Sequence, residues 1–186
     1  CKPASDSTDT RDRARTALEY HADWFDLLGL PVTPYYGITV HIGATYGDVE
    51  ATAERLHAFV DSLSDAARAR LTVENDDKES LWSVPELVEL ISEPTDIPVV
   101  FDYHHHSFTD RGYTYREAFE LAAETWNEVR PMTHYSEPAC LRDPTVRPQA
   151  HAEFVADLPA WLVANSDVMI EADGKERAVL QLRDDA

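Results

Sequence analysis

Acidic and imidazole side chains stand at the ends of five short apolar runs in this chain. The residues concerned are His41, Glu74, Asp102, His134 and Glu171. A carboxylate directly after an apolar strand faces burial, which is costly unless the carboxylate is paired or bound to a metal. Three carboxylates that converge repel one another, and divalent cations are the usual relief. These residue types in these positions therefore indicate a metal centre.

The strongest local signal is the run Asp102-Tyr103-His104-His105-His106. Successive side chains of an extended chain point to opposite sides, so three consecutive histidines cannot all face one metal ion. We expect Asp102 and His105 to face the metal, with His104 and His106 in supporting or loop positions.

Five other acidic and histidine residues have simpler interpretations. Asp76 and Asp77 are expected to cap or begin the loop after Glu74. His151 is as well suited to a ligand role as to a place at the start of a helix. His21 and His57 fall within helical patterns, and we expect them to be structural or to face solvent.

The donor set constrains the metal and its chemistry. Mixed imidazole and carboxylate ligands fit Mn²⁺, Zn²⁺ or Fe²⁺ better than Ca²⁺, which prefers oxygen ligands alone. Which of these metals is bound does not follow from the donor set. A cluster of two or more such ions suits hydrolysis of a phosphodiester, because one ion can activate water while another holds the phosphate.

Hydrophobic spacing predicts five helices that alternate with five strands. The helices are expected at about residues 10–29, 48–63, 82–91, 115–126 and 150–162, and the strands at 37–42, 71–73, 97–101, 132–134 and 168–170. Strict alternation with apolar strands indicates a parallel sheet covered by helices, either doubly wound or closed as a barrel. All five strand ends carry reactive residues, which favours a (β/α)8-type barrel, where every strand end meets at one mouth.

The chain length suggests part of such a barrel. It has 186 residues and begins at Cys1 without an initiator methionine, whereas a complete barrel usually needs ~250 residues. We expect residues 1–186 to form one domain, the C-terminal part of a barrel whose N-terminal strands are absent. About five strand-helix units would then be present.

The charge is strongly acidic, with 35 Asp and Glu against 16 Lys and Arg. A surface of this kind argues against a generic nucleic-acid binder, which presents a basic face. Adaptation to high salt, as in a halophile, would also explain the excess of acidic residues, because concentrated salt screens the repulsion between their charges.

No apolar run is long enough to cross a membrane, and Cys1 and Cys140 lack metal-ligand spacing. We expect a cytoplasmic monomer.

Six segments together resemble the UV-damage endonuclease family. In order and spacing they cover nearly the whole chain, and they are Val40-His41-Ile42-Gly43, Tyr46-Gly47-Asp48, 71–76 (LTVEND), 99–105 (VVFDYHH), 131–136 (PMTHYS) and 167–176 (DVMIEADGKE). The resemblance implies a barrel related to that of endonuclease IV, a trinuclear metal site often filled with Mn²⁺, and incision 5′ to damaged bases in double-stranded DNA.

The resemblance also implies roles for particular residues. Glu74 corresponds to the bridging carboxylate, and the other metal ligands correspond to His41, Asp102, His105, His134 and Glu171. His151 corresponds to a third-metal or phosphate contact. Glu74, Asp102, His134 and Glu171 form the expected catalytic set.

Two departures from the family pattern limit this transfer. Further histidine ligands and lesion-probing residues of the family belong to earlier strands, upstream of Cys1. Many members also carry a lysine two residues before the His134 position, where this chain has Met132. The acidic charge is compatible with DNA if the metals supply positive charge at the phosphate and the lesion is recognised by its deformability.

Two alternatives stay open. A metal-dependent sugar isomerase or epimerase of the same barrel type also places Glu, Asp and His at strand ends. A partial barrel without catalytic activity would keep the fold and, at most, an affinity for metal.

Overall fold

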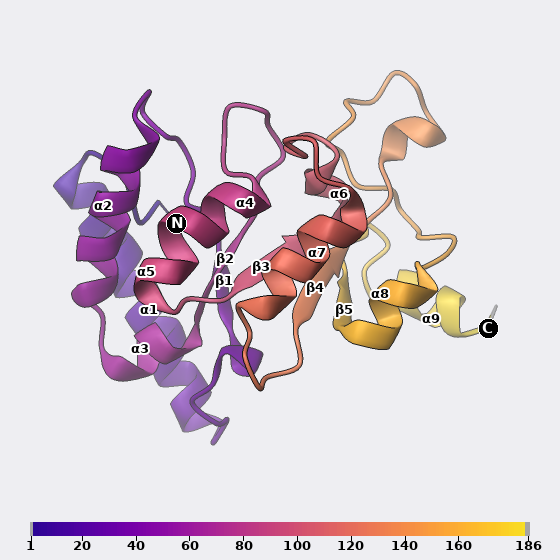
Figure 1. The fold of residues 1–186 in the computed structure, drawn as a ribbon. Helices are drawn as coiled ribbons and strands as arrows, with labels where there is room; N and C mark the ends of the chain where they lie inside the picture. The colour runs from indigo at the N-terminus through magenta and orange to yellow at the C-terminus, as the bar shows by residue number, and fades with distance from the viewer. Residues whose placement is uncertain (1, 185–186) are drawn as a thin grey trace.

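Five parallel strands form a half-barrel in the computed structural model, which describes residues 2–184. The strands are β1 (Ile38–Val40), β2 (Leu71–Glu74), β3 (Val99–Asp102), β4 (Met132–Tyr135) and β5 (Asp167–Ile170), and they pair in the order β1-β2-β3-β4-β5 (Figure 1). Sequential order without reversal is the winding of a barrel, since a doubly wound sheet reverses at a switch point. The predicted fold class is confirmed.

Helices cover the outer face of this sheet and lead from one strand to the next (Figure 1). The α-helices are α1 (Thr8–Leu27), α2 (Val49–Asp61), α3 (Asp65–Arg70), α4 (Val84–Leu87), α5 (Glu93–Thr95), α6 (Tyr103–His106), α7 (Tyr115–Glu124), α8 (Ala160–Asn165) and α9 (Glu176–Asp184). A π-helical segment, η2 (Val88–Ser92), joins α4 to α5, and η1 (Pro34–Tyr36) and η3 (Ala139–Leu141) are 3₁₀ turns.

Several helices begin where a side chain caps the first turn. Asp48 accepts a hydrogen bond from the Ala51 amide at the start of α2, and Thr114 and Glu117 form a capping box at the start of α7. Such caps satisfy amides that have no partner within the helix, and each contributes about 1 kcal/mol. They fix where the chain turns from the mouth of the half-barrel into the next helix.

Side chains alternate between the two faces of the sheet. Val73, Val99 and Phe101 point outward and are buried in the hydrophobic core beneath the helices. Their neighbours Glu74 and Asp102 therefore point to the inner face. Because Asp102 pairs with His134 in register, these three polar residues share the inner face at the carboxyl ends of their strands.

The opposite end of the half-barrel is tied together by a polar network. The hydroxyl of Tyr35, in η1, donates a hydrogen bond to Asp167 Oδ2 at 2.8 Å, and Arg130 Nε lies 2.9 Å from Asp167 Oδ1. These bonds connect the segment before β1 to the start of β5. The two outermost strands are thereby held at a fixed separation.

The prediction of one helix over residues 150–162 is wrong. Only α8, from Ala160, is helical there, because the backbone of residues 150–153 bonds to distant segments instead. The Ala152 amide donates to Glu137 O at 2.8 Å, and Ala152 O and Glu153 O accept from Asp173 and Gly174. Gly174 is required at this contact, since an added Cβ would come within 2.3 Å of Glu153 O.

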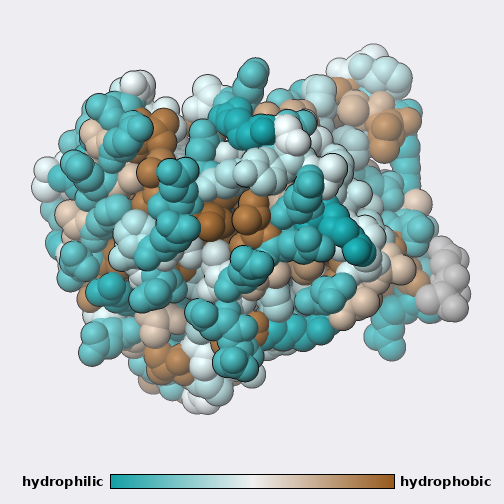
Figure 2. Space-filling model, viewed as in Figure 1, coloured by the Kyte–Doolittle hydropathy of each residue, from teal (hydrophilic) through white to brown (hydrophobic). Residues whose placement is uncertain are grey.

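Other boundaries shift less. The helix expected at 82–91 is divided into α4 and the π-helical segment η2, and the separate helices α3 and α9 were not predicted. Hydrophilic residues cover most of the face shown in Figure 2, with smaller hydrophobic patches among them. Within residues 2–184, no helix combines the length and the apolar character needed to cross a membrane.

The side chain of Asn75 ties the end of β2 to the end of β3. It is fully buried, accepts a hydrogen bond from the Asp102 amide at 2.8 Å and donates one to Asp102 O at 3.0 Å. These two bonds replace the strand pairing beyond Glu74 and hold Glu74 and Asp102 side by side.

We predict that Asn75→Ala lowers the free energy of unfolding by ~2–4 kcal/mol, because two buried backbone groups lose their partners. Urea denaturation followed by circular dichroism measures this change. Asn165→Ala is the matched control, since Asn165 is exposed and bonds only to Trp161 O, and surface changes of that kind stay within about 0.5 kcal/mol. Equal effects of the two substitutions would contradict the assigned role of Asn75.

Candidate metal centre

The mouth of the half-barrel brings together side chains from all five strand ends. His41 directly follows β1, Glu74 and Asp102 end β2 and β3, His134 lies in β4, and Glu171 directly follows β5. Carboxyl ends of parallel strands meet at one edge of the sheet, so residues up to 130 positions apart become neighbours. The sequence prediction placed these residues together, and the structure does the same.

Two groups of potential ligand atoms share the Glu74 carboxylate. The first consists of His41, Glu74 and His105, and the second of Glu74, Asp102, His134 and Glu171. Within each group the ligand atoms all lie within 4.8 Å of one another. A carboxylate that belongs to both groups has two oxygens and can bridge two cations.

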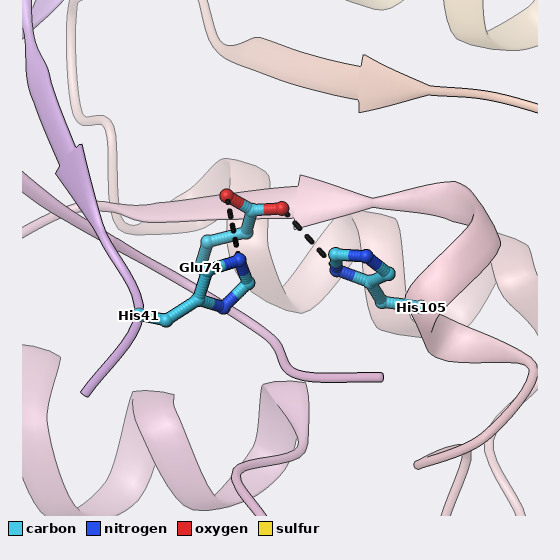
Figure 3. Close-up of side chains that lie close together, drawn as sticks. All are labelled: His41, Glu74 and His105. Atoms are coloured by element: carbon cyan, nitrogen blue, oxygen red, sulfur yellow. Dashed lines mark ion pairs between the residues drawn. The ribbon is translucent and has the colours of Figure 1, made fainter. Parts of the chain in front are cut away.

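In the first group the two oxygens of Glu74 face different imidazoles (Figure 3). Glu74 Oε2 lies 3.6 Å from His41 Nε2, and Glu74 Oε1 lies 3.3 Å from His105 Nδ1. The Glu74 side chain is only 6% exposed, whereas that of His41 is 42% exposed. The group is therefore reached from the His41 side.

In the second group His134 lies between two carboxylates. Its Nδ1 is 3.2 Å from Glu74 Oε2 and 3.2 Å from Glu171 Oε1. Asp102 is fully buried behind them. Glu171 was expected to be buried as well, but its side chain is 34% exposed, because it follows the edge strand β5 and has no further strand beside it within residues 2–184.

Buried polar atoms without hydrogen-bond partners concentrate at this centre. Glu74 Oε1, Asp102 Oδ2 and both ring nitrogens of His134 are buried and make no hydrogen bond of acceptable geometry. Each such atom costs ~1–3 kcal/mol in a folded protein. Close approach of lone-pair atoms without hydrogen bonds is the arrangement expected of metal ligands, because a cation satisfies all of them at once.

The buried carboxylate and the imidazoles of the centre shift one another's pKa values. Burial raises the pKa of Glu74, but the adjacent imidazoles of His105 and His134 outweigh burial and hold it well below its ordinary value. Burial lowers the pKa of His105, yet its contacts with Glu74 and Asp102 raise it to about 9, and the pKa values of His41 and His134 are also raised. Imidazoles with raised pKa values hold their protons more readily than usual, and they would have to release these protons before a divalent metal could bind.

Three histidines are oriented through the same ring atom. Nδ1 of His41 lies 3.1 Å from Asp76 Oδ1, while Nδ1 of His105 and of His151 lie 3.0 and 2.9 Å from the carbonyl oxygens of Asn75 and Glu171. When Nδ1 carries the proton in such a contact, Nε2 keeps its lone pair. Metal-bound histidines are held in this way by carboxylate or carbonyl partners.

Asp76 is the site residue that sequence reasoning missed. We expected it to cap or begin a loop, but it is buried and contacts His41, because its amide bonds to Trp82 O and turns the chain back toward the mouth. The signal in the sequence was the Glu-Asn-Asp series, whose loop geometry cannot be read from spacing. Asp77, by contrast, is half-buried and makes no such contact.

His105 and His106 point in different directions, as the sequence predicted, but the backbone that separates them is helical and not extended. Residues Tyr103–His106 form one helical turn, α6, and the assumed extended chain is wrong. Asp102 caps the turn by accepting a hydrogen bond from the His105 amide at 2.7 Å. His105 therefore faces Glu74, whereas His106 packs against Phe101 at 5.5 Å between ring centroids.

The remaining histidines lie beside the centre or far from it. His151 belongs to neither ligand group, but its ring centroid is 5.7 Å from that of His104 and 6.1 Å from that of His105. His21 is exposed and His57 bonds to Leu90 O, as expected of structural residues. Met132 is half-buried in β4, two positions before His134 and on the same face.

A family model described as UV-endonuclease UvdE matches residues 2–186. The UV DNA damage endonuclease of Bacillus cereus (strain B4264) is 32% identical over 192 residues, which cover 97% of this chain and 57% of the relative. The UV-damage endonuclease of Neurospora crassa is 35% identical over 181 residues, covering 89% of this chain and 26% of that protein.

Among solved structures, the crystal structure of SacUVDE matches with a TM-score of 0.82 and 29% identity, over 96% of this chain and 59% of that one. The chain thus spans a little over half the length of its bacterial relative and of this structural neighbour. The family match covers the five strand ends and the half-barrel that carries them, and we conclude that the chain belongs to the UV-endonuclease UvdE family.

Proposed function

We propose that this chain carries the metal centre of a DNA-repair endonuclease that cuts double-stranded DNA on the 5′ side of UV photoproducts and other helix-distorting lesions. Family membership supports repair of damaged DNA by a nuclease. The observation that carries the metal dependence is the position of Glu74, whose buried carboxylate belongs to both ligand groups.

The proposed ligands divide between two cation positions. His41, Glu74 and His105 would hold one ion, and Glu74, Asp102, His134 and Glu171 would hold the other. His151 stands next to His105 and is our candidate for a further metal or phosphate contact. The mixture of nitrogen and oxygen donors favours Mn²⁺, with Zn²⁺, Mg²⁺ and Fe²⁺ as alternatives.

Bound ions would polarise the phosphate and supply a deprotonated water at neutral pH. The chain's own residues hold and orient the parts of the site. Glu74, Asp102 and Glu171 supply the negative charge that retains cations, and Asp76 and Asn75 fix the rings of His41 and His105. In the overall hydrolysis, a water oxygen forms a bond to phosphorus, one phosphorus–oxygen bond breaks, and the leaving oxygen takes up a proton.

The strongly acidic surface does not oppose this function. Bound ions at the mouth would place positive charge where the phosphate must approach. A distorted, weakly stacked lesion can also be recognised through its low cost of deformation, without a broad basic face. A high-salt habitat, in which surface cations contribute little to DNA affinity, is our explanation for the net charge of −19.

We predict that the metal-free protein takes up Mn²⁺ and that Glu74→Gln weakens this binding by more than the ~10–100-fold that loss of an outer contact produces. The amide lacks the charge and the second donor oxygen that a bridging ligand needs. Equilibrium dialysis followed by elemental analysis gives both stoichiometry and affinity. Glu89→Gln is the control, because Glu89 is exposed on η2 and its loss changes the net charge equally.

Asp76 and its neighbour Asp77 provide a second matched pair. We predict that Asp76→Asn lowers metal affinity ~10–100-fold, since the His41 ring loses its charged partner, whereas Asp77→Asn leaves it unchanged. Calorimetric titration of both variants with Mn²⁺ measures the difference. Identical affinities would remove Asp76 from the support of the centre.

The nuclease activity itself is tested with supercoiled plasmid. We expect the full-length protein, of which this chain is the proposed C-terminal part, to nick UV-irradiated plasmid with Mn²⁺ and to leave unirradiated plasmid intact. We expect EDTA or Glu74→Gln to abolish nicking while Glu89→Gln retains it. Gel electrophoresis separates nicked from supercoiled forms. Nicking by the Glu74→Gln variant at the wild-type rate would contradict the proposed role of the shared carboxylate.

A further inference from the structure

Three arginines line one pocket between α1 and α2 in a chain whose net charge is −19. The pocket has a volume of about 280 Å³ and is lined by Arg11 and Arg15 from the first turns of α1, by Arg55 from α2, and by Asp12 as its one acidic residue. It lies outside both ligand groups of the metal centre. With three arginines and one carboxylate, the lining of the pocket carries an excess of positive charge.

Hydrogen bonds to backbone carbonyls and threonine hydroxyls hold the guanidinium groups of Arg11 and Arg55 in place. Arg11 donates to Ser5 O and to Thr8 Oγ1, and Arg55 donates to Ala4 O at 3.1 Å and to Thr52 Oγ1 at 2.7 Å. Ala4 and Ser5 are buried beneath them. A guanidinium has five N–H donors, so each of these two groups keeps donors that those partners do not use.

Arg15 differs from the other two because it has only a surface partner. Its guanidinium lies 2.8 Å from Asp12 Oδ1, and both side chains are about half exposed, at 44% and 55%. An exposed pair of this kind contributes little to stability. Arg15 can therefore turn toward an anion in the pocket at small cost.

The pocket is connected to the metal centre through one loop. The guanidinium of Arg55 lies 5.4 Å from the centroid of the Tyr46 ring, and Tyr46 belongs to the loop that begins at His41. The backbone of Tyr46 is in the left-handed region, with φ of 53°, which is unusual for a tyrosine. Five residues of chain place the Cα atoms of His41 and Tyr46 within ~18 Å of each other.

We propose that this pocket, formed by Arg11, Arg15 and Arg55, binds a phosphate oxyanion. Arginine is the side chain best matched to phosphate, because its planar donors meet two oxygens at once. If the proposed endonuclease function holds, on which this part rests, the natural source is a backbone phosphodiester of the DNA that flanks the lesion. A free phosphate compound is the other source of the same chemistry.

The test compares two exposed arginines on the same helix. Arg15→Gln removes a pocket residue whose side chain is 44% exposed, whereas Arg13→Gln removes a more exposed residue, at 80%, that pairs with Asp9 outside the pocket. Both substitutions delete one positive charge and one surface ion pair. Binding is measured with EDTA present, so that the metal centre cannot hold the phosphate.

In the DNA arm, fluorescence anisotropy follows binding of an irradiated duplex oligonucleotide over a range of salt concentrations. We expect Arg15→Gln to reduce the slope of log Kobs against log[salt] by ~0.9, the value for one lost phosphate contact, and Arg13→Gln to leave the slope unchanged. In the second arm, calorimetry with inorganic pyrophosphate should show binding to the wild type that Arg15→Gln weakens and Arg13→Gln does not.

The outcomes separate the pocket from the endonuclease function. A selective Arg15 effect in both arms supports a DNA phosphate in the pocket, and an effect on pyrophosphate alone supports an oxyanion pocket that a free phosphate compound fills. Equal behaviour of the two variants in both arms overturns the proposal, even when wild-type protein nicks irradiated plasmid. Absence of nicking with intact pyrophosphate binding would instead count against the endonuclease function and leave the pocket standing.

Discussion

The burial of one negative charge, that of Glu74, determines how the rest of the mouth is built. A carboxylate with 6% of its side chain exposed is tolerated only where positive charge surrounds it. Imidazoles that follow or lie in three other strands surround it, at 3.6 Å for His41, 3.3 Å for His105 and 3.2 Å for His134, and they reach Glu74 only because the strands are parallel and in sequential order. The centre therefore depends on the strand order, because a different order would leave the Glu74 carboxylate without its imidazole partners.

The supporting contacts around the centre are mostly made by backbone atoms. Carbonyl oxygens of Asn75 and Glu171 face the rings of His105 and His151, and the Asn75 side chain bonds to both backbone groups of Asp102. Backbone partners are set by the path of the chain, so they do not move when a ligand changes its protonation. The orientation of the His105 and His151 rings is thus fixed before any cation arrives.

The sequence was most informative where a short apolar run ends in a charged residue. That pattern identified His41, Glu74, Asp102, His134 and Glu171, because burial of the run forces its last residue to the strand end. It failed for Asp76, whose position depends on a turn made by a bond to Trp82 O. Helical spacing was misleading at residues 150–162. There the helix is overridden by backbone bonds to residues 137 and 173–174, which no local pattern records.

The hydrogen bond from Tyr35 to Asp167 joins residues that are 132 positions apart. A contact over such a separation requires closing a very long loop. Contacts of this kind slow folding, because the chain loses conformational entropy before the favourable contact forms. The segments that carry His41 and Glu171 are brought to their final separation in the same step. The contact between Tyr35 and Asp167 is consequently expected to form late in folding, after the pairing of neighbouring strands has brought the ligands of each group together.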